Sequence, residues 1–158
     1  LVEFFLALLR DLHIPLILAD SDDDFDVDSN LTLDILWPPK QWDGGVRNIN
    51  DTSIVLYVVS SASSLLLMGD VTASVERRLL ALYPSLHANI LKLPHHGSRF
   101  SSSEIFLQSL HPQLAAISAG KENAYGHPHA EVLERLATLG IPWRSTLEEG
   151  TISLTLPP

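Results

Sequence analysis

Apolar and polar positions along the 158-residue chain follow two periods, one typical of helices and one typical of strands. Residues 2–12 carry apolar side chains on one helical face, and Pro15 ends that run. Residues 31–36 alternate apolar with polar side chains, as expected of a half-buried strand. The segments 53–59 and 64–68 are strand-length apolar runs separated by serines. We predict that these two runs form a hairpin, in preference to a membrane-spanning helix.

The rest of the chain alternates further strand and helix patterns. Strands are predicted at residues 14–18, 88–93, 114–118, 141–145 and 151–156, and helices at 72–82, from a capping box at 101–104 to about 110, and at 128–139. Within the helix at 72–82, we expect Glu76 to be exposed. Directly joined strands together with helical crossovers predict an α/β fold with a mixed sheet.

Six aspartates fall within residues 20–28 and predict a solvated acidic loop. A calcium loop is the alternative, although the segment lacks the central glycine and final glutamate of such loops. The polar segment 40–51, with its paired glycines, is also expected to be a loop.

The composition limits the class of protein. With 46% hydrophobic and 18% charged residues, the chain is expected to fold as one unit with its own core. Nineteen acidic against ten basic residues give a net charge of -9, which disfavours direct binding to a phosphate backbone. Because the chain has no cysteine, any transition metal must be bound by His, Asp and Glu.

Chemistry-bearing residues follow two of the predicted strands. Asp70 comes after the second hairpin strand, and His95 and His96 stand between a proline and a glycine after the next strand. The ends of neighbouring strands in an open sheet form a crevice where ligands bind. A carboxylate and imidazoles there could bind a metal and hydrolyse a substrate, whereas the alternatives are a helix cap for Asp70 and structural roles for the histidines.

A second set of candidates lies in the neighbouring loops. Ser98 could bind a phosphate or cap a turn, and Arg99 could pair with phosphate or be a solvated loop residue. Asn123, Tyr125 and His127 precede a predicted helix start, where amides favour an anion. His127 is the candidate third active-site group; capping the helix is its alternative role. His129 is expected to be exposed.

Several segments together resemble the ComEC family of DNA-internalisation competence proteins, in particular their C-terminal metallo-β-lactamase-like domain. The matching segments are residues 50–56 (Asn-Asp-Thr-Ser-Ile-Val-Leu), 65–70 (Leu-Leu-Leu-Met-Gly-Asp), 91–98 (Leu-Lys-Leu-Pro-His-His-Gly-Ser), 117–120 (Ile-Ser-Ala-Gly), 123–128 (Asn-Ala-Tyr-Gly-His-Pro) and 146–152 (Thr-Leu-Glu-Glu-Gly-Thr-Ile). They occur in the family's order across almost the whole chain.

The resemblance implies a metallo-β-lactamase-like αβ/βα sandwich with up to two divalent ions, zinc or manganese, and a metal that activates water to attack a phosphodiester. It implies metal ligation by Asp70 and His96, with His95 and His127 as catalytic groups; the choice between His95 and His96 as ligand stays open. Ser98, Arg99, Asn123 and Tyr125 would bind substrate. The implied partners are single-stranded DNA, the rest of a polytopic channel in the bacterial inner membrane, and the DNA-uptake machinery.

One family motif, His-x-His-x-Asp-His, is absent. We therefore expect residues 1–158 to be the C-terminal portion of a single such domain, lacking its N-terminal part and any transmembrane segment. Because Asp70 and one histidine are fewer than the three ligands of a catalytic zinc site, this portion should bind metal weakly and lack nuclease activity, which the parent could have. The alternatives are a non-catalytic DNA-guiding module of the same channel and a small-ester or phosphocholine hydrolase of the same fold.

Overall fold

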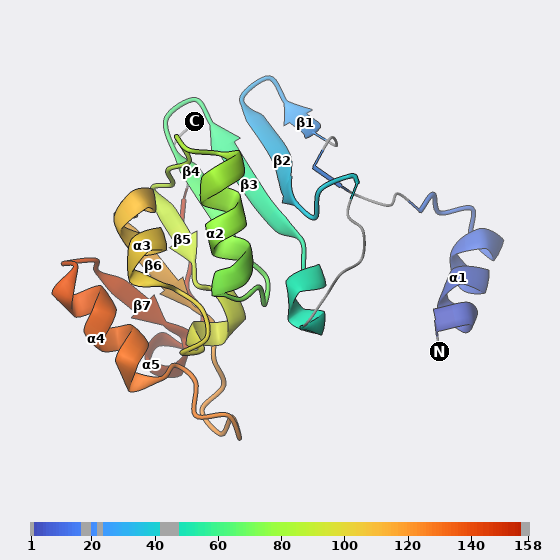
Figure 1. The fold of residues 1–158 in the computed structure, drawn as a ribbon. Helices are drawn as coiled ribbons and strands as arrows, with labels where there is room; N and C mark the ends of the chain where they lie inside the picture. The colour runs from blue at the N-terminus through green and yellow to red at the C-terminus, as the bar shows by residue number, and fades with distance from the viewer. Residues whose placement is uncertain (1, 17–19, 22–23, 42–47, 156–158) are drawn as a thin grey trace.

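The computed structural model describes residues 2–16, 20–21, 24–41 and 48–155, and Figure 1 shows their fold. Within these ranges, one seven-stranded mixed sheet is accompanied by five α-helices, as an α/β fold requires. The elements in chain order are α1 (Val2–Asp11), β1 (Asp24–Asp28), β2 (Leu31–Trp37), the 3-10 helix η1 (Ile49–Thr52), β3 (Val55–Ser60), β4 (Ser64–Leu67), α2 (Ala73–Leu82), β5 (Ile90–Lys92), the 3-10 turn η2 (Pro94–Gly97), α3 (Glu104–Leu110), β6 (Leu114–Ile117), α4 (Ala130–Thr138), β7 (Trp143–Ser145) and α5 (Thr146–Glu149).

Each strand pairs with the strand before it, so the order of the sheet is the order of the chain. Strands β1 to β4 are antiparallel, whereas β4 to β7 are parallel and connected through helices. The predicted hairpin is confirmed, with Val59 opposite Ser64. None of the helices in the described ranges has the length and apolar character needed to cross a membrane.

Helices α2, α3 and α4 cover one face of the parallel half of the sheet (Figure 1). This follows from right-handed crossovers that all step in one direction across the sheet. Leu66, Leu91 and Ala115 lie side by side in register on three strands, and each is fully buried beneath the helices. The core therefore lies between this face and the helices, and the strand ends beyond it carry the candidate chemistry.

The opposite face of the same strands is less covered. Leu65, Leu67 and Lys92 alternate with the buried row and are half-buried. Together with Ile152 and Leu154 from the chain after α5, they line a cavity of about 380 Å³.

At the N-terminal end, the predicted helix is confirmed as α1, and none of its residues is buried. It lies apart from the sheet in Figure 1. The strand predicted at 14–18 is wrong for residues 14–16, which form no strand and expose Ile14 and Leu16 by about half; residues 17–18 lie outside the described ranges. Apolar character alone favoured a strand here, but no strand in the described ranges pairs with residues 14–16.

The acidic loop prediction is wrong for its second half, because Asp24–Asp28 forms strand β1. Phe25 pairs with Leu33 of β2, and the aspartates alternate with Phe25 and Val27. Period-two alternation fits a strand even when its polar positions are acidic, and β1 is an edge strand, where charged side chains stay in water. Of the loop predicted at 40–51, residues 42–47 lie outside the described ranges, and residues 49–51 belong to η1.

Three boundaries also differ from prediction. The capping box is wrong: Ser101 Oγ donates to the carbonyl of Val71, and Glu104 accepts from Gln108 instead of closing the helix start. Helix α4 begins at Ala130, after Pro128. Residues 151–155 form no strand, and residue 156 lies outside the described ranges, whereas the short helix α5 precedes them.

Candidate functional site

Asp70 lies in a tight turn after β4 whose backbone is fixed by Ser53. The Asp70 amide donates to Ser53 Oγ over 3.1 Å. Gly69 precedes it with φ +55°, and a Cβ at this position would lie 2.7 Å from Ser53 Cβ, so only glycine fits. On the other side of the turn, Asp51 accepts from both the amide and the hydroxyl of Thr72, the N-cap of α2. The carboxylate of Asp70 is thereby held at the carboxyl end of the parallel strands.

His95 and His96 lie in η2, directly after β5. Both residues have left-handed backbone conformations, with φ +48° and +56°, which non-glycine residues rarely adopt. The amide of His95 donates to the carbonyl of Gly69 over 2.9 Å, which joins this turn to the turn of Asp70. Such strained conformations persist where surrounding contacts over-determine them and are concentrated at functional sites. The turn is what brings both imidazoles to one side of the strand ends.

The geometry of His96 and Asp70 is that of two groups facing a common point. His96 Nδ1 lies 2.6 Å from the carbonyl oxygen of Ser118, which can only accept, so Nδ1 carries the proton and Nε2 has a free lone pair. Nε2 lies 3.6 Å from Asp70 Oδ1. This is too long for a good hydrogen bond, but two ligands of one tetrahedral metal with bonds of about 2.0 Å lie about 3.3 Å apart.

The donor set therefore fits two ligands of a divalent metal. A backbone carbonyl that orients the second ring nitrogen of a ligating histidine is a common feature of metal sites. In addition, His95 Nδ1 is buried without any hydrogen-bond partner in the described part of the chain. No group of three or more His, Asp or Glu residues close enough to hold a metal occurs within the described ranges, so the site offers an incomplete ligand set.

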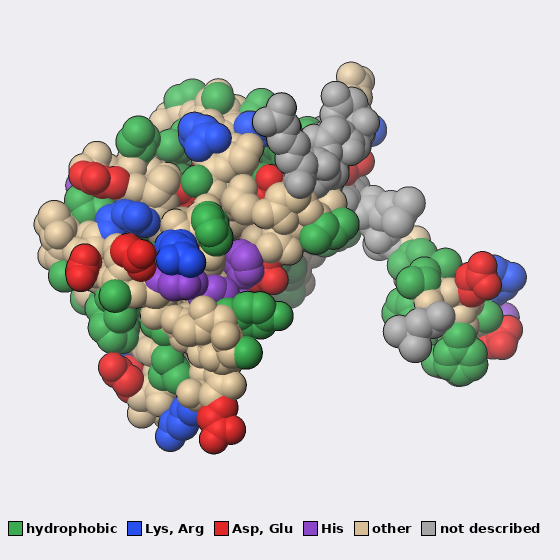
Figure 2. Space-filling model, turned by 60° about the horizontal axis from the view of Figure 1, so that its bottom comes forward, with side chains coloured by type: hydrophobic (Ala, Val, Ile, Leu, Met, Phe, Trp, Pro, Cys, Tyr) green, Lys and Arg blue, Asp and Glu red, His purple; other side chains and the backbone are tan. Residues whose placement is uncertain are grey.

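Four histidine rings gather around this point, and Figure 2 shows histidine side chains grouped on one face. The His127 ring lies 5.3 Å from that of His95, 6.4 Å from that of His96 and 4.8 Å from that of His129, measured between centroids. Burial lowers the pKa of His127, the mutual repulsion that it would have with protonated His129, His95 and His96 lowers it further, and Asp70 opposes this. His127 is therefore held in its neutral form near pH 7. The prediction that His129 is exposed is wrong, because this ring is half-buried in the cluster.

The loop before α4 brings His127 and Tyr125 to the site. Asn123 fixes this loop: its Oδ1 accepts from the His127 amide, and its Nδ2 donates to the carbonyls of Gly120 and His127. These hydrogen bonds give the Asn123 side chain a structural role, because they hold the loop in place. The exposed Tyr125 ring stacks on His127 with 5.8 Å between centroids, beside a cavity of about 420 Å³ that also reaches His96.

Ser98 and Arg99 differ in what they can offer a ligand. Ser98 is 1% exposed and its Oγ accepts from the Phe100 amide, so the structure favours the turn-capping alternative over phosphate binding. Arg99 is exposed, 4.0 Å from Glu131, and its amide donates to His129 Nδ1 over 3.3 Å. The backbone of Arg99 is thereby held beside the histidine cluster, and its guanidinium lies near Glu131 and over the ring of Phe100.

The sequence did not reveal a buried group of contacts beneath this site, formed by Glu76, Arg135 and the backbone of residues 101–103, which we call the clamp. Glu76 is 0% exposed, although the helical pattern predicted it on the outer face. Its two carboxylate oxygens accept from the amides of Ser102 over 2.5 Å and Ser103 over 2.9 Å, and Arg135 of α4 donates to the carbonyls of Ser101 and Ser102. Burial raises the pKa of Glu76, and its hydrogen bonds to Ser103 and Ser102 and the charge of Arg135 partly offset this.

The clamp holds the segment that connects the two halves of the site. Residues 98–103 contain Arg99 and directly follow η2, the turn that contains the histidine pair. In the same segment, the carbonyl of Phe100 accepts from the amide of Ala73 at the start of α2. The segment is thus tied to the helix that follows Asp70 and, through Arg135, to the helix that follows His127.

Two other sets of contacts that position the site involve residues of the matching segments, although the sequence did not reveal what these residues do. Asp51 and Ser53 belong to the segment 50–56 that carries the family resemblance, so their presence was visible there but their task was not. Thr146, in the last matching segment, exchanges hydrogen bonds with the backbone of Ala119, next to the carbonyl that orients His96. Pairwise spacing could not reveal either contact, because each links segments far apart in the chain.

Known proteins with similar sequences include a competence protein and a recombination protein. No protein-family model matches the chain. It is 41% identical to ComE operon protein 3 of Bacillus subtilis over 65% of the chain, 37% identical to competence protein ComA of Neisseria gonorrhoeae over 73% of it, and 34% identical to recombination protein 2 of Haemophilus influenzae over 68% of it.

The matched region covers 13% of the length of ComE operon protein 3 and of recombination protein 2, and 18% of that of ComA. The chain therefore corresponds to a small part of each relative. One of these names refers to competence and another to recombination. The relatives support a ComEC-type competence family for this chain.

Proposed function

We propose that the chain supplies part of the metal-dependent hydrolase centre of a DNA-uptake protein, acting on phosphodiester bonds. One observation supports this more than any other: the proton on His96 Nδ1 is fixed by Ser118, which leaves Nε2 facing Asp70 Oδ1 at 3.6 Å. In this proposal Asp70 and His96 are metal ligands. The names of the relatives support the role in DNA uptake.

The metal, zinc or manganese, would activate water and stabilise negative charge on phosphate. The other residues act through their own positions. His127, kept neutral by burial, holds its ring against that of His95 and can donate to or accept from a phosphate oxygen or leaving group. Arg99 presents an exposed guanidinium suited to two-point contact with phosphate, and Tyr125 borders the cavity.

The proposal includes the finer architecture, a metallo-β-lactamase-like αβ/βα sandwich. Helices cover one face of the sheet, and the other face offers half-buried apolar side chains such as Leu65 and Leu67. A second sheet layer outside this chain would cover them and supply the remaining metal ligands. In the whole protein, this domain would be attached to a channel in the inner membrane, and single-stranded DNA would be its substrate.

Metal binding by the chain itself tests the ligand assignment. Titration calorimetry with zinc chloride and with manganese chloride should detect weak binding, because two ligands are fewer than a catalytic zinc site uses. Asp70→Ala and His96→Ala should each weaken it at least tenfold, whereas His87→Ala, at an exposed histidine on the other end of β5, should leave it unchanged. Binding that survives both site variants would refute the assignment.

Activity measurements test the need for further ligands. The chain alone should not cleave a single-stranded oligonucleotide in the presence of either metal. Robust cleavage that Asp70→Ala abolishes would contradict the view that ligands from outside the chain are required. The absence of metal binding in the intact chain would favour a non-catalytic DNA-guiding module, which the incomplete ligand set within the described residues also allows.

A further inference from the structure

A second cavity lies away from the histidine cluster, between strand β2 and the segment that joins α2 to β5. Its volume is about 470 Å³. His87 borders it and precedes β5, whereas His95 and His96 follow β5, so the cavity and the candidate metal site are at opposite ends of that strand. Nothing in the proposed hydrolase chemistry uses it.

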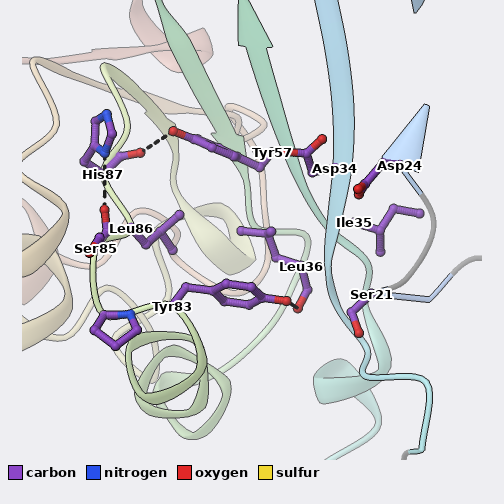
Figure 3. Close-up of a pocket in the computed structure, with 11 residues that line it drawn as sticks. Ser21, Asp24, Asp34, Ile35, Leu36, Tyr57, Tyr83, Ser85, Leu86 and His87 are labelled. Atoms are coloured by element: carbon purple, nitrogen blue, oxygen red, sulfur yellow. Dashed lines mark hydrogen bonds between the residues drawn. The ribbon is translucent and has the colours of Figure 1, made fainter. Parts of the chain in front are cut away.

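Aromatic and aliphatic side chains form most of its wall. The rings of Tyr57 and Tyr83 lie on opposite sides of the cavity in Figure 3, with Leu36 and Leu86 between them. Tyr57 donates its hydroxyl hydrogen to the carbonyl of His87, and this hydrogen bond fixes the orientation of the Tyr57 ring in the cavity wall. Such a wall suits a ligand with an apolar body and offers ring faces to a cation.

Two carboxylates stand at one end of this cavity (Figure 3). Asp24 of β1 and Asp34 of β2 are direct partners in the antiparallel register. Like charges directly opposite each other on neighbouring strands destabilise a sheet. Within the described part of the chain, neither carboxylate has a hydrogen-bond or ion-pair partner, and the neighbouring Asp26 adds a further negative charge.

The sheet therefore keeps an unfavourable charge pair at the mouth of an apolar, aromatic cavity. A positively charged ligand would relieve the repulsion, and its body would displace water from the wall. An inorganic cation would interact with the carboxylates alone and leave the apolar wall unused, and an anion would be repelled by Asp24 and Asp34. The combination of apolar wall, ring faces and carboxylates is complementary to an organic cation.

We propose that this cavity binds a small organic ammonium ligand, whose cation lies between Asp24 and Asp34 and whose apolar body lies between Tyr57 and Tyr83. The site is independent of the proposed hydrolase centre, so either can fail without the other. The wall and the charges identify the class of ligand, a primary amine on a short aromatic or aliphatic body.

Benzylamine is a suitable probe, and benzyl alcohol is its neutral match. In methyl-detected NMR titrations of the whole chain, benzylamine should cause saturable shifts at Leu36 and Leu86, and benzyl alcohol should bind at least tenfold more weakly. Asp34→Asn should weaken benzylamine binding at least tenfold. Asp28→Asn removes the same charge from an exposed position of β1 outside the cavity and should change it less than twofold.

A second readout separates loss of binding from loss of structure. Removing one of two facing carboxylates should raise the melting temperature of Asp34→Asn above that of the native chain, even though binding is lost. Equal binding of the alcohol, equal loss in Asp28→Asn, no saturable shift, or a lower melting temperature of Asp34→Asn would each overturn the proposal.

Discussion

Glu76→Gln should destabilise the chain strongly, although it replaces one oxygen by a nitrogen. Both oxygens of the buried carboxylate accept backbone hydrogen bonds, from Ser102 and Ser103. A carboxamide has one acceptor, so its amino group would face one of these N–H groups, donor against donor. The charge opposite Arg135 is lost in the same substitution.

The magnitude follows from these two losses. A hydrogen bond to a charged group contributes about 1.5 to 3 kcal/mol, and a buried N–H group left without its acceptor costs about 1 to 3 kcal/mol. Arg135 keeps the carbonyls of Ser101 and Ser102 as acceptors, which places the total at the lower end. We expect a loss of about 3 kcal/mol, or a melting temperature about 6 to 12 °C lower for a domain of this size.

Urea unfolding at pH 7, followed by tryptophan fluorescence, measures this loss. Glu104→Gln is the matched control, because Glu104 is exposed at the start of α3, and it should change stability by less than about 0.5 kcal/mol. A loss below about 1 kcal/mol for Glu76→Gln would refute the clamp, since the segment would then be held by its other contacts.

Three further predictions concern the same region. Because burial raises the pKa of Glu76 above its ordinary 4.5, ionising this carboxyl costs more free energy in the folded chain than in the unfolded chain. The difference in unfolding free energy between native chain and Glu76→Gln should therefore be larger at pH 4.5 than at pH 7 and shrink as pH rises through the folded-state pKa of Glu76; a difference that grows with pH would contradict this. Gly97→Ala places a Cβ 2.7 Å from a proline Cβ and should cost about 1 to 3 kcal/mol more than Gly140→Ala, where φ is also positive but the space is open; similar urea midpoints for the two variants would show that the crowding is relieved. Asn123→Ala removes three hydrogen bonds from its loop, so hydrogen exchange of the His127 amide should become at least tenfold faster, and an unchanged rate would show that the loop is held by other means.

The sequence predicted elements whose signal is local. The hairpin of β3 and β4 and the helix α2 each contain enough apolar residues in one period to identify them, and the same logic predicted that Asp70 and the histidine pair end neighbouring strands. Strand β1 was missed because its polar positions are all aspartate, a residue that strands disfavour, although Phe25 pairs with Leu33 as the alternation requires.

Other features depend on contacts between distant segments. Glu76 lies one turn into a helix, where charge alone favours the solvent, and only the approach of residues 98–103 explains its burial. Likewise, the sequence could not choose between His95 and His96 as the metal ligand. The carbonyl of Ser118 orients the ring of His96, and this contact favours His96 as the ligand.

The agreement between strand order and chain order has a consequence for how this protein forms. Every strand finds its partner in the segment made just before it, so each pairing closes only the short stretch that separates two consecutive strands. The sheet can therefore grow outward by one strand at a time as the polypeptide leaves the ribosome, with each new strand added to an edge that already exists.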